Sequence, residues 1–180
     1  MRNLLIAAAA AALLSTTPAL AQTMTAADVG ATPLTGTSAP DYVKLAADSD
    51  KFEIESGRIA ASRSKREDVK GFGKQMIADH TTTTKALMAA LNNQERRIAP
   101  PSTRLSAENQ AKIDLLKKAP KDSFDQLYLQ QQLEAHKTAW ALHKGYADNG
   151  TDAALKQVAT TAIPAIERHL GMLKGMTGGM

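Results

Sequence analysis

The amino-acid sequence predicts an all-α protein, a four-helix bundle with a short extra helix in the link between its second and third long helices. Three observations predict this fold. Apolar residues recur at helical spacing over four long stretches, no stretch alternates as a strand does, and the second link is long. Because each long helix carries one apolar face, these faces can be buried only against one another, which favours a bundle.

The first long helix is expected over residues 41–64. Its inward stripe is expected to contain Leu45, Ser49, Phe52, Ser56 and Ile59. Two acidic residues, Glu53 and Glu55, fall on opposite edges of this stripe. The link to the next helix is short, so the first two helices are expected to be antiparallel neighbours.

The second long helix is expected over residues 65–93, and its stripe is the most regular in the chain, with Val69, Phe72, Met76, His80, Leu87 and Leu91. Pro100 and Pro101 break the chain after it. Ser106 is placed to cap a short helix that ends before Pro120.

The third long helix is expected to begin behind Asp122, whose carboxylate can accept from the first amides, and to stop at Gly150. The fourth is expected to begin behind Thr151, and Pro164 inside it predicts a kink. The stripes of these two helices contain Leu129, Leu133, His136, Trp140, Ala162, Ile166, His169 and Leu173.

The N-terminal end has the features of a cleaved signal peptide, expected over residues 1–21. Arg2 precedes an unbroken apolar run at residues 4–14, and cleavage is expected after Ala21. The run is too short for an ordinary membrane-spanning helix, and no cysteine follows it to carry a lipid anchor. We therefore expect a periplasmic or secreted protein.

The rest of the chain divides into three parts. Residues 22–40 are rich in Thr, Ala, Gly, Ser and Pro and predict a flexible leader. Residues 41–176 are expected to form the four-helix bundle domain, and residues 177–180 predict a disordered tail. We expect no transmembrane segment after signal cleavage, because no later stretch is apolar enough to cross a bilayer.

The composition argues against a nucleic-acid partner. The chain has 22 Lys and Arg against 18 Asp and Glu, a net charge of +4, and the two signs are interspersed. Aromatic residues make up only 4% of the chain, whereas nucleic-acid binding favours a basic stripe and stacking aromatic rings. The partner is unknown, and an envelope protein is the class that the expected location suggests.

Three of the four histidines, His80, His136 and His169, sit at the centres of apolar stripes on three different helices. With Glu53 or Glu55 from the first helix, they could form a metal site in the bundle core, suited to one Zn, Cu or Fe ion. The alternative is a structural or interaction module in which the same residues form a hydrogen-bonded core network without metal.

Enzymatic chemistry is not expected. A di-iron bundle site needs Glu-x-x-His on two helices, but Ile77 stands three residues before His80 and Ile166 three before His169. No nucleophile–base pair and no phosphate-binding loop is apparent. A copper(I) variant of the site would instead add the thioethers of Met76, Met172 and Met176.

Six short motifs, in order, make the chain similar to a bacterial family known as domain of unknown function 4142. They are FEIESGRIA (52–60), VKGF (69–72), MIADH (76–80), FDQLY (124–128), EAH (134–136) and IPAIERHL (163–170). The resemblance covers residues of about 40–175, nearly all of the chain after the signal peptide.

This resemblance implies a ferritin-like four-helix bundle that a bacterium exports, and it implies no established reaction. Members of the family are often labelled as outer-membrane or exported proteins. His80, His136 and His169 match the usual histidine positions of the family, and Glu55 matches a usual acid. His143 stands where the family commonly has an aromatic residue, which favours a packing role for it.

Overall fold

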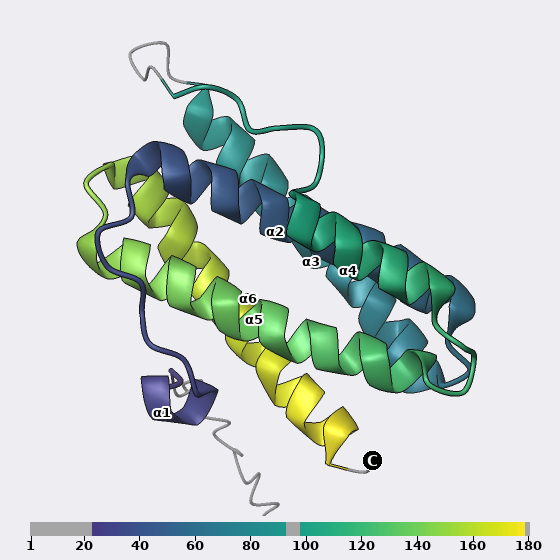
Figure 1. Cartoon of the computed structure of the whole chain (residues 1–180). Helices are drawn as coiled ribbons and strands as arrows, with labels where there is room; N and C mark the ends of the chain where they lie inside the picture. Colours follow the sequence, from purple (N-terminus) through teal and green to yellow (C-terminus); the bar gives the residue numbers. More distant parts are fainter. Residues whose placement is uncertain (1–22, 93–97, 179–180) are drawn as a thin grey trace, which may run out of the picture.

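The computed structural model describes residues 23–92 and 98–178. Within these residues the protein has no strand, and four of its helices are long and packed as a bundle (Figure 1). The described helices are α1 (Ala26–Val29), α2 (Ala39–Arg63), α3 (Glu67–Leu91), α4 (Ala107–Lys118), α5 (Phe124–Asn149) and α6 (Ala153–Thr177). The predicted all-α four-helix bundle is confirmed, and so is the short helix, α4, between the second and third long helices.

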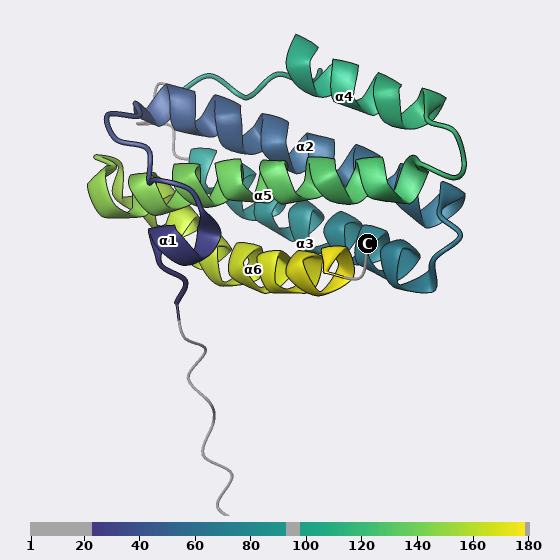
Figure 2. The ribbon, with the colours of Figure 1, turned by 60° about the horizontal axis from the view of Figure 1, so that its bottom comes forward.

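The four long helices form two hairpins. α2 and α3 are joined by a short turn, and α5 and α6 make the second hairpin against them (Figure 1). α4 lies outside the bundle, along α2 and α5 (Figure 2). The guanidinium of Arg63 holds the end of α4 by donating to carbonyl oxygens there, which lack partners within the helix; they belong to Leu116, Lys117 and Ala119.

The helix starts agree only in part with the expected caps. Ser106 caps α4 as predicted, with its hydroxyl accepting from an amide of the first turn. The cap of α6 is Asp152 and not Thr151, because the Asp152 carboxylate reaches two amides of the first turn. The residue before α5 is Ser123, which makes no side-chain capping bond, so the expected cap at Asp122 is wrong.

The core lies between the two hairpins and runs the length of the bundle. The buried face of α2 is rotated from the predicted stripe: Leu45 is 45% exposed, whereas Phe52 and Ser56 are buried as expected. Tyr42, about one helical turn before Leu45, is fully buried instead. The largest buried side chains are Trp140, Tyr42, Tyr128, Tyr146, Phe52, Phe72 and Phe124.

α2 and α3 approach each other closely at two glycines, Gly57 and Gly73. A Cβ atom on Gly57 would lie 2.6 Å from the carbonyl oxygen of Gly73, and a Cβ on Gly73 would lie 2.7 Å from that of Gly57. Real Cβ atoms do not come this close to backbone, so both positions need glycine. The contact brings the backbones of the two helices together one to two turns from Glu53 and His80.

The segment before α2 differs from the expected flexible leader over residues 22–40. Residues 26–29 form α1, and α2 already begins at Ala39. Val29 is 3% exposed in a cluster with Trp140, and the amide of Leu34 donates to the carbonyl of Ala141 in α5 at 2.9 Å. Residues 23–38 are therefore packed on the second hairpin, through contacts that the composition of the segment does not reveal.

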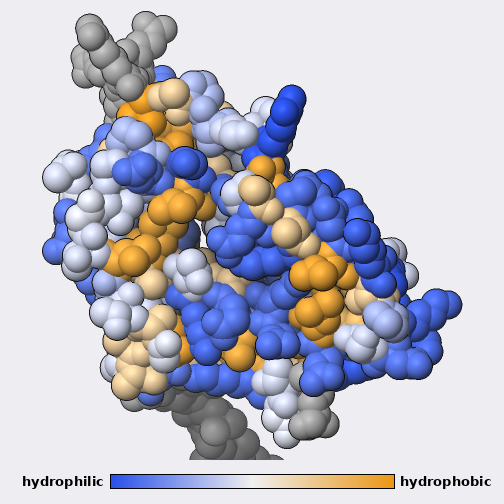
Figure 3. All heavy atoms as spheres, viewed as in Figure 1, coloured by the Kyte–Doolittle hydropathy of each residue, from blue (hydrophilic) through white to orange (hydrophobic). Residues whose placement is uncertain are grey.

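The two ends of the chain are described only in part. The predicted signal peptide, residues 1–21, lies outside the described residues, and so do residues 179–180 of the predicted tail. No described helix combines the length and the apolar character needed to cross a membrane. On the face shown in Figure 3, the surface is mostly hydrophilic and the apolar side chains form separate patches.

Candidate metal centre

Three imidazole rings meet in the middle of the bundle, each from a different long helix. His80 comes from α3, His136 from α5 and His169 from α6, and their exposed fractions are 5%, 1% and 1%. One ligand nitrogen from each ring lies within 4.8 Å of the other two. The three predicted histidines therefore lie at the same depth in the bundle, which the sequence alone could not show.

The His80 ring is oriented by a buried carboxylate of α2. Its Nδ1 lies 2.8 Å from Oδ1 of Asp50, and the hydroxyls of Thr83 and Thr84 donate to the same carboxylate at 2.8 and 3.0 Å. A carboxylate held by two hydroxyl donors acts as an acceptor for the ring, so Nδ1 carries a hydrogen. The other nitrogen, Nε2, is buried and has no hydrogen-bond partner among the described residues.

The His136 and His169 rings are held in the same way. Nδ1 of His136 lies 2.9 Å from the carbonyl oxygen of Gln132, which can only accept, so Nδ1 is the protonated nitrogen. Nε2 of His169 lies 2.7 Å from Oδ2 of Asp79. In all three rings an oxygen acceptor therefore binds one nitrogen, and the other nitrogen is free of hydrogen when the ring is neutral. This is the arrangement in which metal-bound histidines are held.

The two unprotonated nitrogens of His136 and His169 face each other. Nε2 of His136 is 3.2 Å from Nδ1 of His169, with no hydrogen to share between neutral rings. Two nitrogens bound to one tetrahedral ion at about 2.0–2.1 Å would be separated by about 3.3 Å. The observed separation therefore fits two ligands of a common ion.

The electrostatics keep two of the three rings neutral. Burial, together with His80 and His169, lowers the pKa of His136 well below its usual value. Burial also lowers the pKa of His169 to about 4, against the hydrogen bond to Asp79. Burial acts in the same direction on His80, but the hydrogen bond to Asp50 and the Glu53 carboxylate outweigh it and raise the pKa. Neutral imidazole is the form that binds a metal.

Glu53, the predicted acidic ligand, borders the centre. It is 1% exposed, and its Oε1 lies 3.6 Å from Nδ1 of His136, the nitrogen that faces away from the other two rings. Within the described part of the chain, its Oε2 is buried without a hydrogen-bond partner. Burial raises its pKa to about 7, against the opposing effect of His80. Glu53 is thus next to the three converging nitrogens but is not one of the group that converges.

Glu55, the other acidic ligand expected from the sequence, does not lie where the three rings converge. It is half-buried and lines a surface groove with Lys51 and Met88. Residues two apart on a helix point about 200° apart, so Glu53 and Glu55 cannot both face the core.

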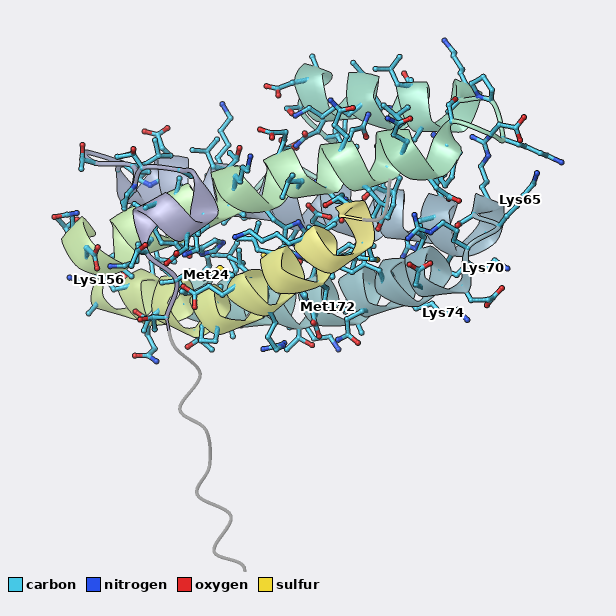
Figure 4. All side chains as sticks on the ribbon, turned by 90° about the horizontal axis from the view of Figure 1, so that it is seen from below. Met24, Lys65, Lys70, Lys74, Lys156 and Met172 are labelled. Carbon is cyan, nitrogen blue, oxygen red and sulfur yellow. The ribbon has the colours of Figure 1, made fainter. Side chains whose placement is uncertain are left out.

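The thioethers of the copper(I) variant do not gather there either. Met172 is 45% exposed and points outward from α6 (Figure 4), while Met76 is buried in an apolar cluster with Phe52 and Phe72. Figure 4 also shows Lys65, Lys70 and Lys74 directed to solvent at the start of α3, away from the centre.

The sequence reasoning missed two groups that hold the ligands, Asp50 and Asp79. Asp50 stands three residues before Glu53, so the two share a helix face, and this spacing was a usable signal. Asp79 adjoins His80 on α3 and is turned away from it, yet it reaches His169 on the neighbouring helix at 2.7 Å. Such a contact between helices leaves no spacing signal in the sequence.

The fourth histidine, His143, serves a separate contact, in agreement with the packing role expected for it. It is buried in α5, two turns beyond His136, and its Nδ1 lies 3.0 Å from the hydroxyl of Tyr42. His143 provides a matched control for the other three, because it is equally buried and lies outside the converging group.

The comparisons with known proteins agree with this fold. The chain is similar to the crystal structure of a DUF305 fragment from Deinococcus radiodurans, with a TM-score of 0.67 and 14% sequence identity over 78% of this chain and 95% of that chain. At this identity the likeness concerns the fold alone. No curated protein matches the chain. The family model described as "Domain of unknown function (DUF4142)" matches residues 22–176. Because that match spans most of the chain, the protein belongs to the DUF4142 family.

Proposed function

We propose that this protein binds one divalent transition-metal ion in the core of its bundle, with His80, His136 and His169 as ligands and Zn²⁺ as the ion. The observation that carries the proposal is how the nitrogens of the three rings are held and where they converge. Each has one nitrogen held by an oxygen acceptor, and one nitrogen of each ring lies within 4.8 Å of the others. A packing role alone would not require one nitrogen from each ring to lie this close to the other two.

The charge balance of the centre supports the same proposal. The carboxyl groups of Asp50, Glu53 and Asp79 all contact one of the three rings, at 2.8, 3.6 and 2.7 Å. Two of those rings are neutral, as their lowered pKa values indicate. A divalent cation among the rings would add positive charge beside these carboxyl groups, in place of the proton that the raised pKa of His80 favours.

The ligand type and the burial support Zn²⁺ and a binding role without catalysis. Imidazole nitrogen suits Zn²⁺, which accepts a tetrahedral site without further demands on geometry. The three rings would fill three positions, and a water molecule would complete the fourth. The three histidine side chains are only 1–5% exposed, so an organic substrate in solution has no access to them.

The proposal places this binding outside the cytoplasm. Its support is the sequence of residues 1–21, with a basic start, an apolar run and a small-residue cleavage pattern that ends at Ala21. Protein from the native host would then begin at Gln22, which an intact mass measures on the same sample that is used for metal analysis.

The test is the metal content of the purified protein, without a histidine tag, beside two variants. His136→Gln removes a ligand and His143→Gln removes an equally buried histidine of the same helix. We expect about one equivalent of metal in the wild type and in His143→Gln, and a loss of at least 10-fold in affinity for Zn²⁺ in His136→Gln, since a ligand matters at least as much as the groups that orient it.

A different outcome would favour the alternative function. If the wild-type protein neither carries metal nor takes up Zn²⁺, Cu²⁺ or Fe²⁺, the three rings form a core network and the protein acts as a structural or interaction module. Equal loss of metal in both variants would instead show that the binding depends on the packing of α5 and not on the His80, His136 and His169 centre.

A further inference from the structure

A surface groove between α3 and α6 lies against the centre. It has a volume of about 240 Å³, and its lining includes Asp79, Thr82 and Thr83 of α3 together with Thr161, Ala165 and Arg168 of α6. Two of these residues belong to the hydrogen-bond network of the three histidines. Asp79 accepts from His169, and Thr83 donates to the Asp50 carboxylate that holds His80.

Asp79 is the most exposed of the three carboxylates that contact the rings. Its side chain is 22% exposed, whereas the side chains of Asp50 and Glu53, the other two carboxylates, are 8% and 2% exposed. The ring behind Asp79, that of His169, is 1% exposed. A single carboxylate therefore separates the solvent in the groove from a ring of the centre.

We propose that this groove is the route by which the metal ion reaches the centre, with Asp79 as the residue that takes the ion from solvent. The inference rests on the proposed metal binding and adds the path to it. Hydrated divalent cations favour carboxylate oxygen, and Asp79 offers one at the floor of the groove.

In the proposed route, binding of the ion to Asp79 would also open the centre. The Asp79 carboxylate holds the His169 ring through the hydrogen bond to Nε2. An ion on that carboxylate competes for the same oxygen, so the hydrogen bond breaks and the ring is free to swing aside. When the ion has passed, the ring returns, with Nδ1 on the ion and Nε2–H again on Asp79. No covalent bond changes in this sequence.

Arg168 opposes the uptake. Its Nη2 lies 3.7 Å from Oδ2 of Asp79, and its side chain is 61% exposed at the groove. A fixed positive charge beside the carboxylate repels an arriving cation and competes with it for the oxygen. Removing this charge should speed uptake, the opposite of the effect of removing the charge of Asp79.

The test measures the rates at which Zn²⁺ enters and leaves the purified protein, with a chromophoric chelator as the indicator. Ala165→Leu fills the groove without touching a ligand, and Ala135→Leu is its matched control, because Ala135 is a half-buried alanine that lines a different groove, beside α4. We expect Ala165→Leu to slow entry and exit by the same factor, roughly tenfold, with an unchanged Kd. A barrier on the path alters both rates alike.

Two charge variants complete the test. Asp79→Asn keeps an oxygen that can accept from His169 but loses the charge, and we expect Zn²⁺ association to slow roughly tenfold. Arg168→Gln should make association faster than in the wild type. Equal rates in Ala165→Leu, Ala135→Leu and the wild type would overturn the proposed route, and the ion would then enter through opening of the bundle.

The two proposals fail in different ways. If the wild-type protein binds no Zn²⁺, the proposed function and the route fall together. If Zn²⁺ binds and depends on His136 but none of the groove variants changes its rates, the metal centre stands and the groove is not its route.

Discussion

At the scale of single residues, His143 makes stability depend on pH. Burial lowers its pKa from 6.5 to about 4, so the folded protein keeps the ring neutral in its contact with Tyr42. The unfolded chain binds a proton near pH 6.5 and therefore holds more protons than the folded state between pH 6.5 and 4. As the pH falls from 6.5 to 4, we expect the free energy of unfolding to fall by up to about 3 kcal/mol because of this one group.

Urea unfolding of metal-free protein at several pH values measures this effect. His136 and His169 also have lowered pKa values and add slopes of the same sign. The His143→Gln variant isolates one contribution. The slope of its unfolding free energy against pH, between pH 6.5 and 4, should be smaller by the equivalent of up to one bound proton. A slope equal to that of the wild type would mean that His143 is protonated in the folded state.

The sequence predicted the three inward histidines but not the carboxylates around them. His80, His136 and His169 lie at the centres of long stripes, where an error of a few tens of degrees in helix rotation changes nothing. Glu53 and Glu55 lie at the edges of a stripe, and there the same error decides which one is buried. The exposed Leu45 and the buried Tyr42 show that the rotation of α2 was misjudged by about this much.

At the scale of elements, the segment before α2 lies against a glycine of α5, whose missing side chain allows the close approach. A Cβ atom on Gly145 would overlap the carbonyl oxygen of Leu34, so the segment can sit there only against glycine. In Gly145→Ala we expect residues around Leu34 to lift off α5 and the hydrogen bond from the Leu34 amide to Ala141 to break. Hydrogen exchange of that amide, followed by NMR, should become faster by at least tenfold.

Gly171→Ala is the control for this prediction. Gly171 lies in α6, and a Cβ atom added there would meet no other atom within 4 Å. Alanine should therefore improve helix propensity by about 1 kcal/mol and leave the Leu34 amide protected. If the Leu34 amide exchanges equally slowly in Gly145→Ala and in the wild type, the segment does not depend on this close contact.

The long helices were predictable to within about two residues, whereas the segment before them was not. Each long helix repeats its apolar spacing over 25 or 26 residues, so errors at single positions average out. The packed segment at 23–38 depends on one backbone hydrogen bond, one hydrogen bond from the Lys174 ammonium to the carbonyl of Asp28, one glycine and a few apolar contacts. None of these has a periodic signal, and the small polar residues there are equally typical of a flexible chain.

At the scale of the whole molecule, the proposed centre joins the two hairpins. His80 belongs to the α2–α3 hairpin, as do the carboxylates of Asp50 and Glu53, while His136 and His169 belong to the α5–α6 hairpin. One ion bound to all three rings would connect α3 to both helices of the second hairpin. Metal binding should therefore stabilise the interface between the hairpins more than either hairpin alone.

This arrangement predicts that metal stabilises the folded protein. A ligand that binds only the folded state raises the free energy of unfolding by about 4 kcal/mol at a free concentration of 1,000 times Kd. We expect Zn²⁺ to raise the melting temperature of the wild type and of His143→Gln, and a chelator to reverse the shift. His136→Gln should show little shift whatever its starting stability, because the comparison is made within each variant. Hydrogen exchange should slow on the facing sides of α3, α5 and α6 when Zn²⁺ is added. A shift of the same size in His136→Gln would mean that Zn²⁺ stabilises the protein from a site other than the one that joins the hairpins.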